Sequence, residues 1–361
     1  MRKGNLGRAT LSCSLLLVVA CIGVSARNLD CTLGLIARPI STVPTIVKAG
    51  DAFDVTLATD KPIEELSILL YQGPERTVVF THSSQQPPLQ PKQGLLTVQA
   101  TAPANVKPGL CGLSAYVRGK AGRSGDTSER AVKVVAEWPR SYSFAHVTDV
   151  HIGRQDPPFR DEVFKRTASE INRIGVDFVL ITGDLTDNGT PEQYRRFLEI
   201  LDSFDAPTFV AAGNHDRGEG AEFGSPNNIY ERYCGPGNYT FDIGSHRYIC
   251  TDTRWTPEFL GYPAYRAWLE EQLKRPNPSF GVVLSHRISE AEYPYFQEEL
   301  PAHNYRVFVY GHTHDDVMSW IGPKRLMLLN TSQELLGTYN IVKIENDQVA
   351  VIDHHHRAAM D

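Results

Sequence analysis

Aspartate, asparagine and histidine gather in five short clusters after residue 140 of this 361-residue chain. Their side chains offer oxygen and nitrogen donors and no sulfur, which suits Mn, Fe, Zn or Ni and argues against a structural thiolate zinc site. Seven candidate ligands are too many for one catalytic ion with an open position. They suit two divalent or mixed-valence ions about 3.5–4 Å apart that share a bridging carboxylate. The candidates are Asp149, His151, Asp184, Asn214, His286, His312 and His314.

Each cluster follows an apolar run that predicts a strand. The runs are Phe144–Thr148, Phe178–Ile181, Thr208–Ala211, Val282–Leu284 and Val307–Tyr310. Any one cluster can occur by chance, but five in order, each at a strand end, are hard to obtain by accident. Glycines precede Asp184, Asn214 and His312, where we expect the backbone to turn sharply.

Helical patterns lie between these strand runs, over Phe159–Ile174, Pro191–Phe204 and Pro263–Lys274. Thr190 and Gln193 form a capping box at the start of the second helix. Alternating strands and helices predict a layered α/β domain, in which ligands bind beyond the carboxyl ends of the strands. The five clusters are therefore expected to converge at one edge.

The other histidines of this region are expected to be structural. His146 falls inside the first strand run and should pack, whereas His246 falls in a turn and His303 in a loop. The run His354-His355-His356 offers nonspecific metal binding but is expected to be an edge or a solvated tail.

Residues 27–137 have a different sequence pattern, in which short apolar runs are separated by turn residues. Residues 53–57 and 113–117 alternate apolar and polar side chains, the period of a half-buried strand. About seven such strands predict an all-β sandwich of immunoglobulin or fibronectin type. We expect residues 138–361 to form a second domain, which carries the five clusters.

The first 26 residues predict a signal peptide. A basic stretch precedes an apolar run over 11–24, which is too short to span a bilayer, and small residues follow it. We expect cleavage after Ala26 and export to the periplasm, the medium or the cell surface. A lipobox-like Val18-Val19-Ala20-Cys21 leaves open a membrane anchor through lipidated Cys21.

If the protein is exported, its four remaining cysteines can form disulfides, because the compartments outside the cytoplasm are oxidising. One bridge per domain is the preferred pairing, Cys31–Cys111 and Cys234–Cys250, out of three possible pairings. Four buried free thiols are the alternative.

Charge excludes one class of partner. The chain carries a net charge of −6, and removal of the leader's three basic residues makes it −9. A general nucleic-acid binder needs a basic surface, so no nucleic acid is expected as a partner. The sequence sets no oligomeric state.

The five clusters together resemble the calcineurin-like metallophosphoesterase superfamily, over about 215 residues. The resemblance implies a four-layer αββα sandwich with a dinuclear centre. It implies that Asp149, His151 and His314 hold one metal and that Asn214, His286 and His312 hold the other. Asp184 would bridge the two metals, and His215 would be a non-ligand catalytic histidine on the leaving-group side.

Two departures narrow the branch. Asn188 stands where phosphoprotein phosphatases of this superfamily have arginine, and Asp187 stands where purple acid phosphatases have their tyrosine ligand. Asp187 is instead expected to orient His215. The G-D-L-x-D and G-N-H-D motifs are most similar to those of bacterial cyclic-nucleotide phosphodiesterases.

We therefore expect an exported phosphoesterase that cleaves a small phosphodiester or phosphomonoester by attack of a metal-bridging hydroxide. Arg154, Arg217 and Arg287 adjoin the ligand loops and are candidates for meeting the phosphate, or else surface charges. The alternative is a binding or adhesion protein whose β-sandwich is the functional part and whose metal site is vestigial.

Overall fold

A computed structural model describes residues 32–155, 157, 159–217, 228–252, 262–288, 292–331 and 337–355. The predicted signal peptide, residues 1–26, lies outside these ranges, and so do Cys21 and Cys31. Across the described ranges, no helix is both long and apolar enough to cross a membrane.

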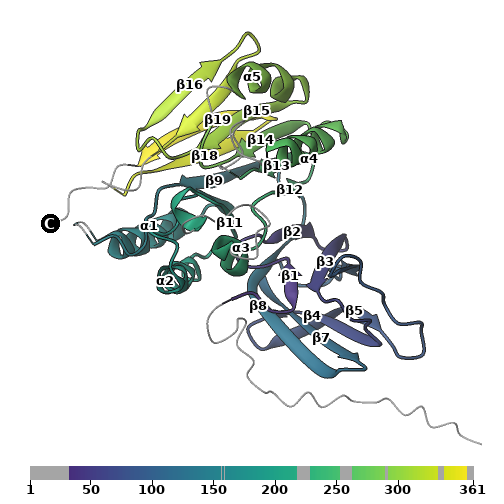
Figure 1. The fold of residues 1–361 in the computed structure, drawn as a ribbon. Coiled ribbons are helices and arrows are strands. Elements are labelled where there is room, and N and C mark those ends of the chain that lie inside the picture. The colour runs from purple at the N-terminus through teal and green to yellow at the C-terminus, as the bar shows by residue number, and fades with distance from the viewer. Residues whose placement is uncertain are drawn as a thin grey trace, which may run out of the picture.

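The N-terminal strands form two sheets that share one apolar core, as expected of a sandwich (Figure 1). Inward residues alternate with exposed ones, so that Phe53, Val55 and Leu57 are buried between outward neighbours. The first sheet has the order β1 (Ile36–Arg38), β3 (Ala52–Ala58), β6 (Leu95–Thr101). The second has the order β2 (Thr45–Lys48), β8 (Gly122–Val135), β7 (Gly109–Gly119), β4 (Glu65–Gln72), β5 (Glu75–His82).

Two further sheets follow and stack on each other. The first, here sheet I, has the order β11 (Thr208–Ala211), β10 (Phe178–Thr182), β9 (Ser141–Val147), β18 (Tyr339–Glu345), β19 (Gln348–His355). The second, sheet II, has the order β12 (Tyr239–Ile243), β13 (His246–Cys250), β14 (Phe280–Leu284), β15 (Tyr305–Tyr310), β17 (Leu326–Asn330), β16 (Val317–Ile321). β8 ends at Val135 and β9 begins at Ser141, and the domain boundary at residue 137 stays a prediction.

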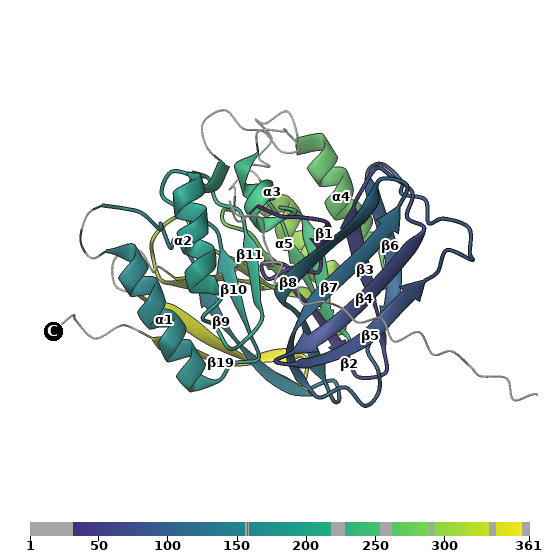
Figure 2. The ribbon, with the colours of Figure 1, turned by 90° about the horizontal axis from the view of Figure 1, so that it is seen from below.

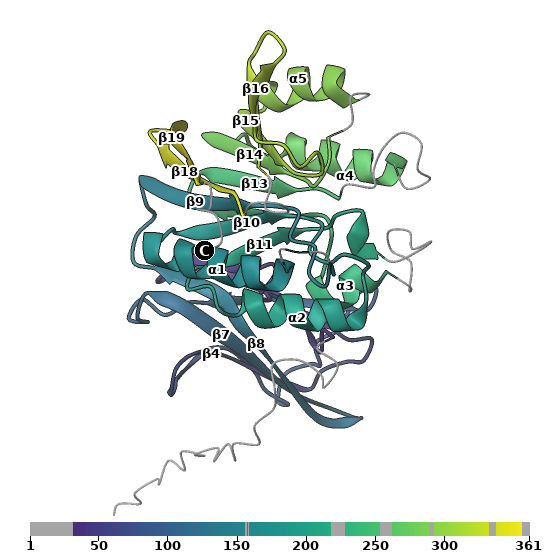
Figure 3. The same ribbon diagram turned by 90° about the vertical axis from the view of Figure 1, so that its left-hand side faces the viewer.

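Helices cover the outer face of each sheet, which makes four layers (Figure 3). α1 (Arg160–Ile174), α2 (Pro191–Leu201) and α3 (Ile229–Cys234) pack on sheet I. α4 (Tyr262–Lys274) and α5 (Tyr293–Ala302) pack on sheet II. The predicted αββα architecture is confirmed.

The caps of the helices follow from the sequence. Gly175 ends α1 in a left-handed conformation with φ of 79°, which glycine adopts without strain. Thr190 accepts a hydrogen bond from the Gln193 N–H at 3.3 Å and opens α2 as predicted. α2 ends at Leu201, three residues before the expected Phe204, because Ser203 and Phe204 bond as a turn.

An aromatic stack fills the space between sheets I and II. The Phe209 and Phe241 rings are stacked with centroids 3.6 Å apart, and Tyr248 stacks on the other side of Phe241 at 4.7 Å. Phe178 is fully buried and meets Phe209, Phe241 and Tyr248 edge-on. Aromatic pairs of this kind add to the burial of their apolar area.

The predicted Cys234–Cys250 disulfide is wrong. Both residues are buried as thiols, and they belong to different cores. Cys234 is the last residue of α3 and belongs to the core on the outer face of sheet I. Cys250 lies between the two sheets, where its Sγ faces the Gly237 carbonyl at 3.7 Å. Cys111 is also a buried thiol, and its predicted partner Cys31 lies outside the described residues.

We predict that Phe178→Ala lowers the free energy of unfolding by about 3–5 kcal/mol, because it empties a large volume between the sheets. Val351→Ala, on the exposed face of β19, is the matched control and should change the free energy by less than about 0.5 kcal/mol. Urea unfolding of both variants measures this, and equal small effects would contradict the packing described.

Candidate metal centre

The five clusters lie at the carboxyl ends of β9, β10, β11, β14 and β15. The first three strands are parallel neighbours in sheet I, and the last two are parallel neighbours in sheet II. The edges of both stacked sheets therefore contribute donors, and the predicted convergence is found across the two sheets.

Asp149, His151 and His314 form one group. One donor atom from each lies within 4.8 Å of the other two. His314 Nε2 is 3.2 Å from Asp149 Oδ1. The loops after β9 and β15 thus meet, although 163 residues separate Asp149 from His312, whose N–H donates to the Asp149 carboxylate at 3.1 Å.

Asp184, His286 and His312 form a second group by the same measure. His286 Nε2 is 3.1 Å from Asp184 Oδ2 and 3.9 Å from Asp149 Oδ1, so it lies between the two carboxylates. Asp184 Oδ2 also lies 3.7 Å from His151 Nε2 in the first group. Asp184 is therefore the carboxylate that faces both groups.

Asn214 and His215 lie in the turn after β11, at the start of the short 3-10 helix His215–Arg217. Asn214 is exposed and follows Gly213, which packs directly against Asp184. The His215 N–H donates to Asp184 Oδ1 at 3.0 Å, and His215 Nε2 is 4.0 Å from Asp184 Oδ2. The structure thus brings the predicted aspartates and histidines together, and it places the backbone on either side of Asn214 against Asp184.

His215 is oriented by a main-chain group of Asp187. His215 Nδ1 lies 2.7 Å from the Asp187 carbonyl oxygen, which can only accept, so Nδ1 carries the proton and Nε2 faces Asp184. The Asp187 carboxylate, which was expected to play this part, lies 3.6 Å from His151 Nδ1. A carboxylate there favours the His151 tautomer whose Nε2 is free for a metal.

His286 is oriented in the same way. Its Nδ1 lies 2.8 Å from the Thr182 carbonyl oxygen, which leaves Nε2 facing the two carboxylates. Beneath it, His146 Nε2 lies 2.9 Å from Thr182 Oγ1. A buried polar layer of His146 and Thr182 therefore supports the ligand from below.

Burial and charge compete at the carboxylates. Burial by itself would raise the pKa of Asp184, but His286 and His151 beside it hold that pKa below its usual value. The same holds for Asp149: burial would raise its pKa, but His314 and His286 beside it keep the pKa below its usual value. For His151 burial dominates and lowers the pKa to about 4, so the ring is neutral at pH 7.

The donor set fits two divalent cations. Two carboxylates are buried side by side, and both nitrogens of His151 are buried with no hydrogen-bond partner among the described residues. Neutral imidazoles and ionised carboxylates are the forms that bind metal. Bound cations would relieve the repulsion between the carboxylates, and one of them would give His151 Nε2 a partner.

The backbone at the site is strained. Asp149, His151, Asp184, His312 and His314 all have positive φ, between 47° and 73°. This conformation costs roughly 1–2 kcal/mol for a residue with a Cβ, and it persists where the surrounding structure enforces it. Such clustering is typical of functional sites.

Two of the glycines serve close approach rather than turning. A Cβ on Gly213 would overlap Asp184, and one on Gly311 would overlap Thr148. Only Gly183, with φ of 90°, takes the left-handed backbone expected of all three. The ligand loops touch each other through glycine backbone.

Asp216 is a supporting residue to which the sequence analysis assigned no role. Its fully buried carboxylate accepts hydrogen bonds from the N–H groups of Gly213, Leu185 and Thr186 at 2.7–3.1 Å. Burial, and then the nearby Asp184, raises its pKa to about 6. It ties the loop after β11 to the loop after β10. Its only sequence signal was its place in the Gly-Asn-His-Asp motif.

The three arginines that were candidates for contacting the phosphate differ in burial. Arg217 is fully buried in an ion pair with Asp252, so it is not available to a phosphate. Arg154 is half-buried and Arg287 is exposed, each beside a ligand loop. These two remain candidates.

His146 is fully buried, as expected. His246 was expected in a turn but is the first residue of β13, where it is buried against Tyr142 and Asp347. His354 and His355 lie on β19, which is an edge strand, and His356 is outside the described residues.

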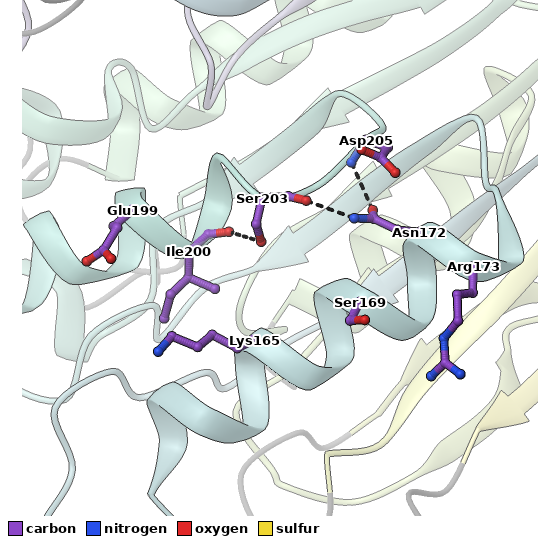
Figure 4. Close-up of a pocket in the computed structure, with 8 residues that line it drawn as sticks. All are labelled: Lys165, Ser169, Asn172, Arg173, Glu199, Ile200, Ser203 and Asp205. Carbon is purple, nitrogen blue, oxygen red and sulfur yellow. Dashed lines mark hydrogen bonds between the residues drawn. The ribbon is translucent and has the colours of Figure 1, made fainter.

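A hollow of about 550 Å³ between α1 and α2 lies away from this site (Figure 4). Its polar groups bond to one another: the Asn172 side chain donates to the Ser203 carbonyl and accepts from the Asp205 N–H, both at 2.8 Å. Its wall also holds two basic residues, Lys165 and Arg173, and two acidic ones, Glu199 and Asp205. It is a groove between two helices, and none of the candidate site residues lines it.

Residues 142–316 match the family model of the calcineurin-like phosphoesterases. These residues form a calcineurin-like phosphoesterase domain. The match confirms the family predicted from the five clusters, and calcineurin-like phosphoesterases use a dinuclear metal site.

Curated relatives of the domain include phosphodiesterases. The chain is 27% identical over 154 residues to a 3',5'-cyclic-nucleotide phosphodiesterase of Nostoc sp., across 40% of this chain and 56% of that protein. It is 51% identical over 43 residues to a probable glycerophosphodiester phosphodiesterase, GpdQ, of Arcobacter nitrofigilis, across 12% of this chain and 16% of that protein. The matched part of the chain therefore covers 56% of the length of the first relative and 16% of the length of the second.

Among solved structures, a purple acid phosphatase from yellow lupin (Lupinus luteus) shares the fold. The TM-score is 0.50 at 14% identity, over 85% of this chain and 72% of that one. The likeness extends into the N-terminal strands, since the residues after Ser141 could not supply that coverage.

We predict that His146→Gln flattens the pH dependence of stability. Burial lowers the pKa of His146 to about 3, so between pH 6.5 and 3 only the unfolded chain takes up this proton. The stability that neutral His146 contributes is complete above pH 6.5 and is lost as the pH falls.

In metal-free protein, the wild type should lose about 2 kcal/mol more than His146→Gln between pH 7 and pH 5, as measured by urea unfolding. His303→Gln, in the turn after α5, is the control and should behave as wild type. Parallel curves for wild type and His146→Gln would contradict a buried neutral histidine.

Proposed function

We propose that this protein is an exported, metal-dependent phosphoesterase that hydrolyses phosphodiester bonds in a small substrate. The observation that carries the proposal is the pair of buried carboxylates, Asp149 and Asp184, ringed by histidines from different strand ends. The names of the bacterial relatives support diesters over monoesters. Residues 1–26, by composition, support export.

Two metal ions are proposed for the two groups of donors. Asp149, His151 and His314 would hold one ion, and His286, His312 and Asn214 would hold the other, with Asp184 shared. When bound, the ions would activate water and offset the charge that develops on the phosphoryl oxygens. The carboxylates and histidines would fix the positions of the two ions before substrate arrives, and this would orient the phosphorus for in-line attack.

His215 is proposed to serve the leaving group. Its Nδ1–H is held by the Asp187 carbonyl, so Nε2 is the nitrogen that exchanges protons at the site. Protonated at Nε2, the imidazolium donates its proton to the departing alkoxide oxygen as the P–O bond breaks. At 42% side-chain exposure His215 can take up the next proton from solvent.

The proposal predicts turnover of bis(p-nitrophenyl) phosphate by protein loaded with Mn²⁺. The diester should react faster than p-nitrophenyl phosphate, and chelation followed by Mn²⁺ readdition should abolish and restore activity. Absorbance of released p-nitrophenolate measures both rates. No turnover with Mn²⁺, Fe²⁺, Zn²⁺ or Ni²⁺ would reject the proposal and favour a binding protein with a vestigial site.

Asp184→Asn and His215→Ala should separate metal binding from proton transfer. Asp184→Asn should lose metal and activity together, because it removes the carboxylate that faces both groups. His215→Ala should keep near-normal metal content and lose about 10²–10⁴-fold in kcat. Elemental analysis after gel filtration, with kcat, measures both.

A substrate with a 2,4-dinitrophenyl leaving group supplies a further control. That oxygen needs no proton, so the penalty of His215→Ala should shrink towards unity. If His215→Ala instead strips the metal, His215 is a ligand and its assignment is wrong.

A further inference from the structure

A segment of the N-terminal region, Ile40–Val43, lies along the outer edge of β11. β11 is the end strand of sheet I, so its outward backbone groups have no strand beside them within that sheet. The Val210 N–H donates to the Thr42 carbonyl oxygen at 3.0 Å. Figure 2 shows the sandwich strands on this side of β11. The segment thus does for β11 what a neighbouring strand would do.

Side chains reinforce this edge contact in both directions. Thr208 Oγ1, on β11, donates to the Ser41 carbonyl at 3.0 Å. Thr42 Oγ1 donates to the Cys234 carbonyl at the end of α3, at 2.8 Å. Ser41 and Thr42 are both buried, at 3% and 0% exposure, so these bonds are made away from water.

The segment is itself held rigidly. Ile40 and Val43 exchange two backbone hydrogen bonds, at 3.2 and 3.1 Å. Ile40 packs so closely on the loop after α3 that a Cβ on Gly235 would lie 2.7 Å from its Cδ1. A further bond across the junction, from Arg130 Nη2 to the Ala206 carbonyl at 2.7 Å, lies just before the start of β11.

β11 is the strand that delivers Asn214 and His215. Only two residues separate its last residue, Ala211, from Asn214. The Val210 carbonyl accepts from Tyr239 Oη at 2.9 Å, so both backbone groups of Val210 are bonded outside sheet I. Displacement of this edge would move the turn that carries Asn214.

We infer that the N-terminal region is part of the metal centre's framework, with Ser41 and Thr42 as positioning residues for Asn214 and His215. The inference rests on the proposed function in taking Asn214 as a ligand. On this inference the sandwich supports the metal site. In the binding or adhesion alternative, the sandwich would act on its own.

The test removes both hydroxyls that hold the segment, in the double variant Thr42→Val/Thr208→Val of the full chain. Calorimetric titration of metal-free protein with Mn²⁺ should show about tenfold weaker binding at one of two sites and little change at the other. Thr42→Ser keeps the hydroxyl and should bind Mn²⁺ as wild type does. Thr97→Val breaks a hydroxyl pair with Thr56 on the exposed face of the sandwich and is the matched control.

Tryptophan fluorescence supplies a second measurement that needs neither metal nor substrate. The four tryptophans, at 138, 255, 268 and 320, all follow the sandwich strands. Leu113→Ala empties part of the sandwich core and, if the two regions unfold as one unit, should lower the urea midpoint that these tryptophans report.

Unchanged Mn²⁺ affinity at both sites in the double variant would overturn the inference. So would a tryptophan midpoint in Leu113→Ala equal to that of wild type. A wild-type protein that binds no Mn²⁺ would reject the proposed function instead, and the tryptophan midpoint would still decide whether the two regions are one unit.

Discussion

Two carboxylates buried beside one histidine set the terms for the rest of this structure. His286 Nε2 faces Asp184 at 3.1 Å and Asp149 at 3.9 Å, with all three side chains out of water. Like charges at this depth repel strongly unless cations or hydrogen bonds offset them. The loops are therefore built to bring imidazoles and N–H groups to these oxygens, and the same arrangement is what a pair of divalent cations requires.

The backbone carries the cost of this arrangement. Five of the candidate ligands take positive φ, and glycine backbone is needed where loops touch. Strain of this kind is tolerated because rigid elements enforce it. Asp216 binds two of the loops together through their N–H groups, and the aromatic stack between the sheets holds the strands from which the loops emerge.

The N-terminal sandwich contacts the edge strands of both sheets that carry the site. It contacts the edge of sheet I through Thr42 and the edge of sheet II through Arg38, whose guanidinium donates to the Thr240 carbonyl at 3.3 Å. Edge strands left bare expose unpaired backbone groups. The sandwich contacts one edge strand of each sheet, as the proposed supporting role requires.

The sequence by itself determined the reaction chemistry and the architecture of the second region. Apolar runs ending in Asp, Asn or His specify local structure and donor type, and both are properties of neighbouring residues. The disulfide predicted between Cys234 and Cys250 was wrong, because sequence spacing does not show which face of a sheet a thiol occupies. The sequence by itself assigned no role to Asp216 or Thr42, and it left Arg217 open as a phosphate contact or a surface charge, whereas Arg217 is buried against Asp252. Tertiary structure decided these, since burial, tautomer and loop-to-loop contact depend on residues far apart in the chain, such as Asp149 and His312.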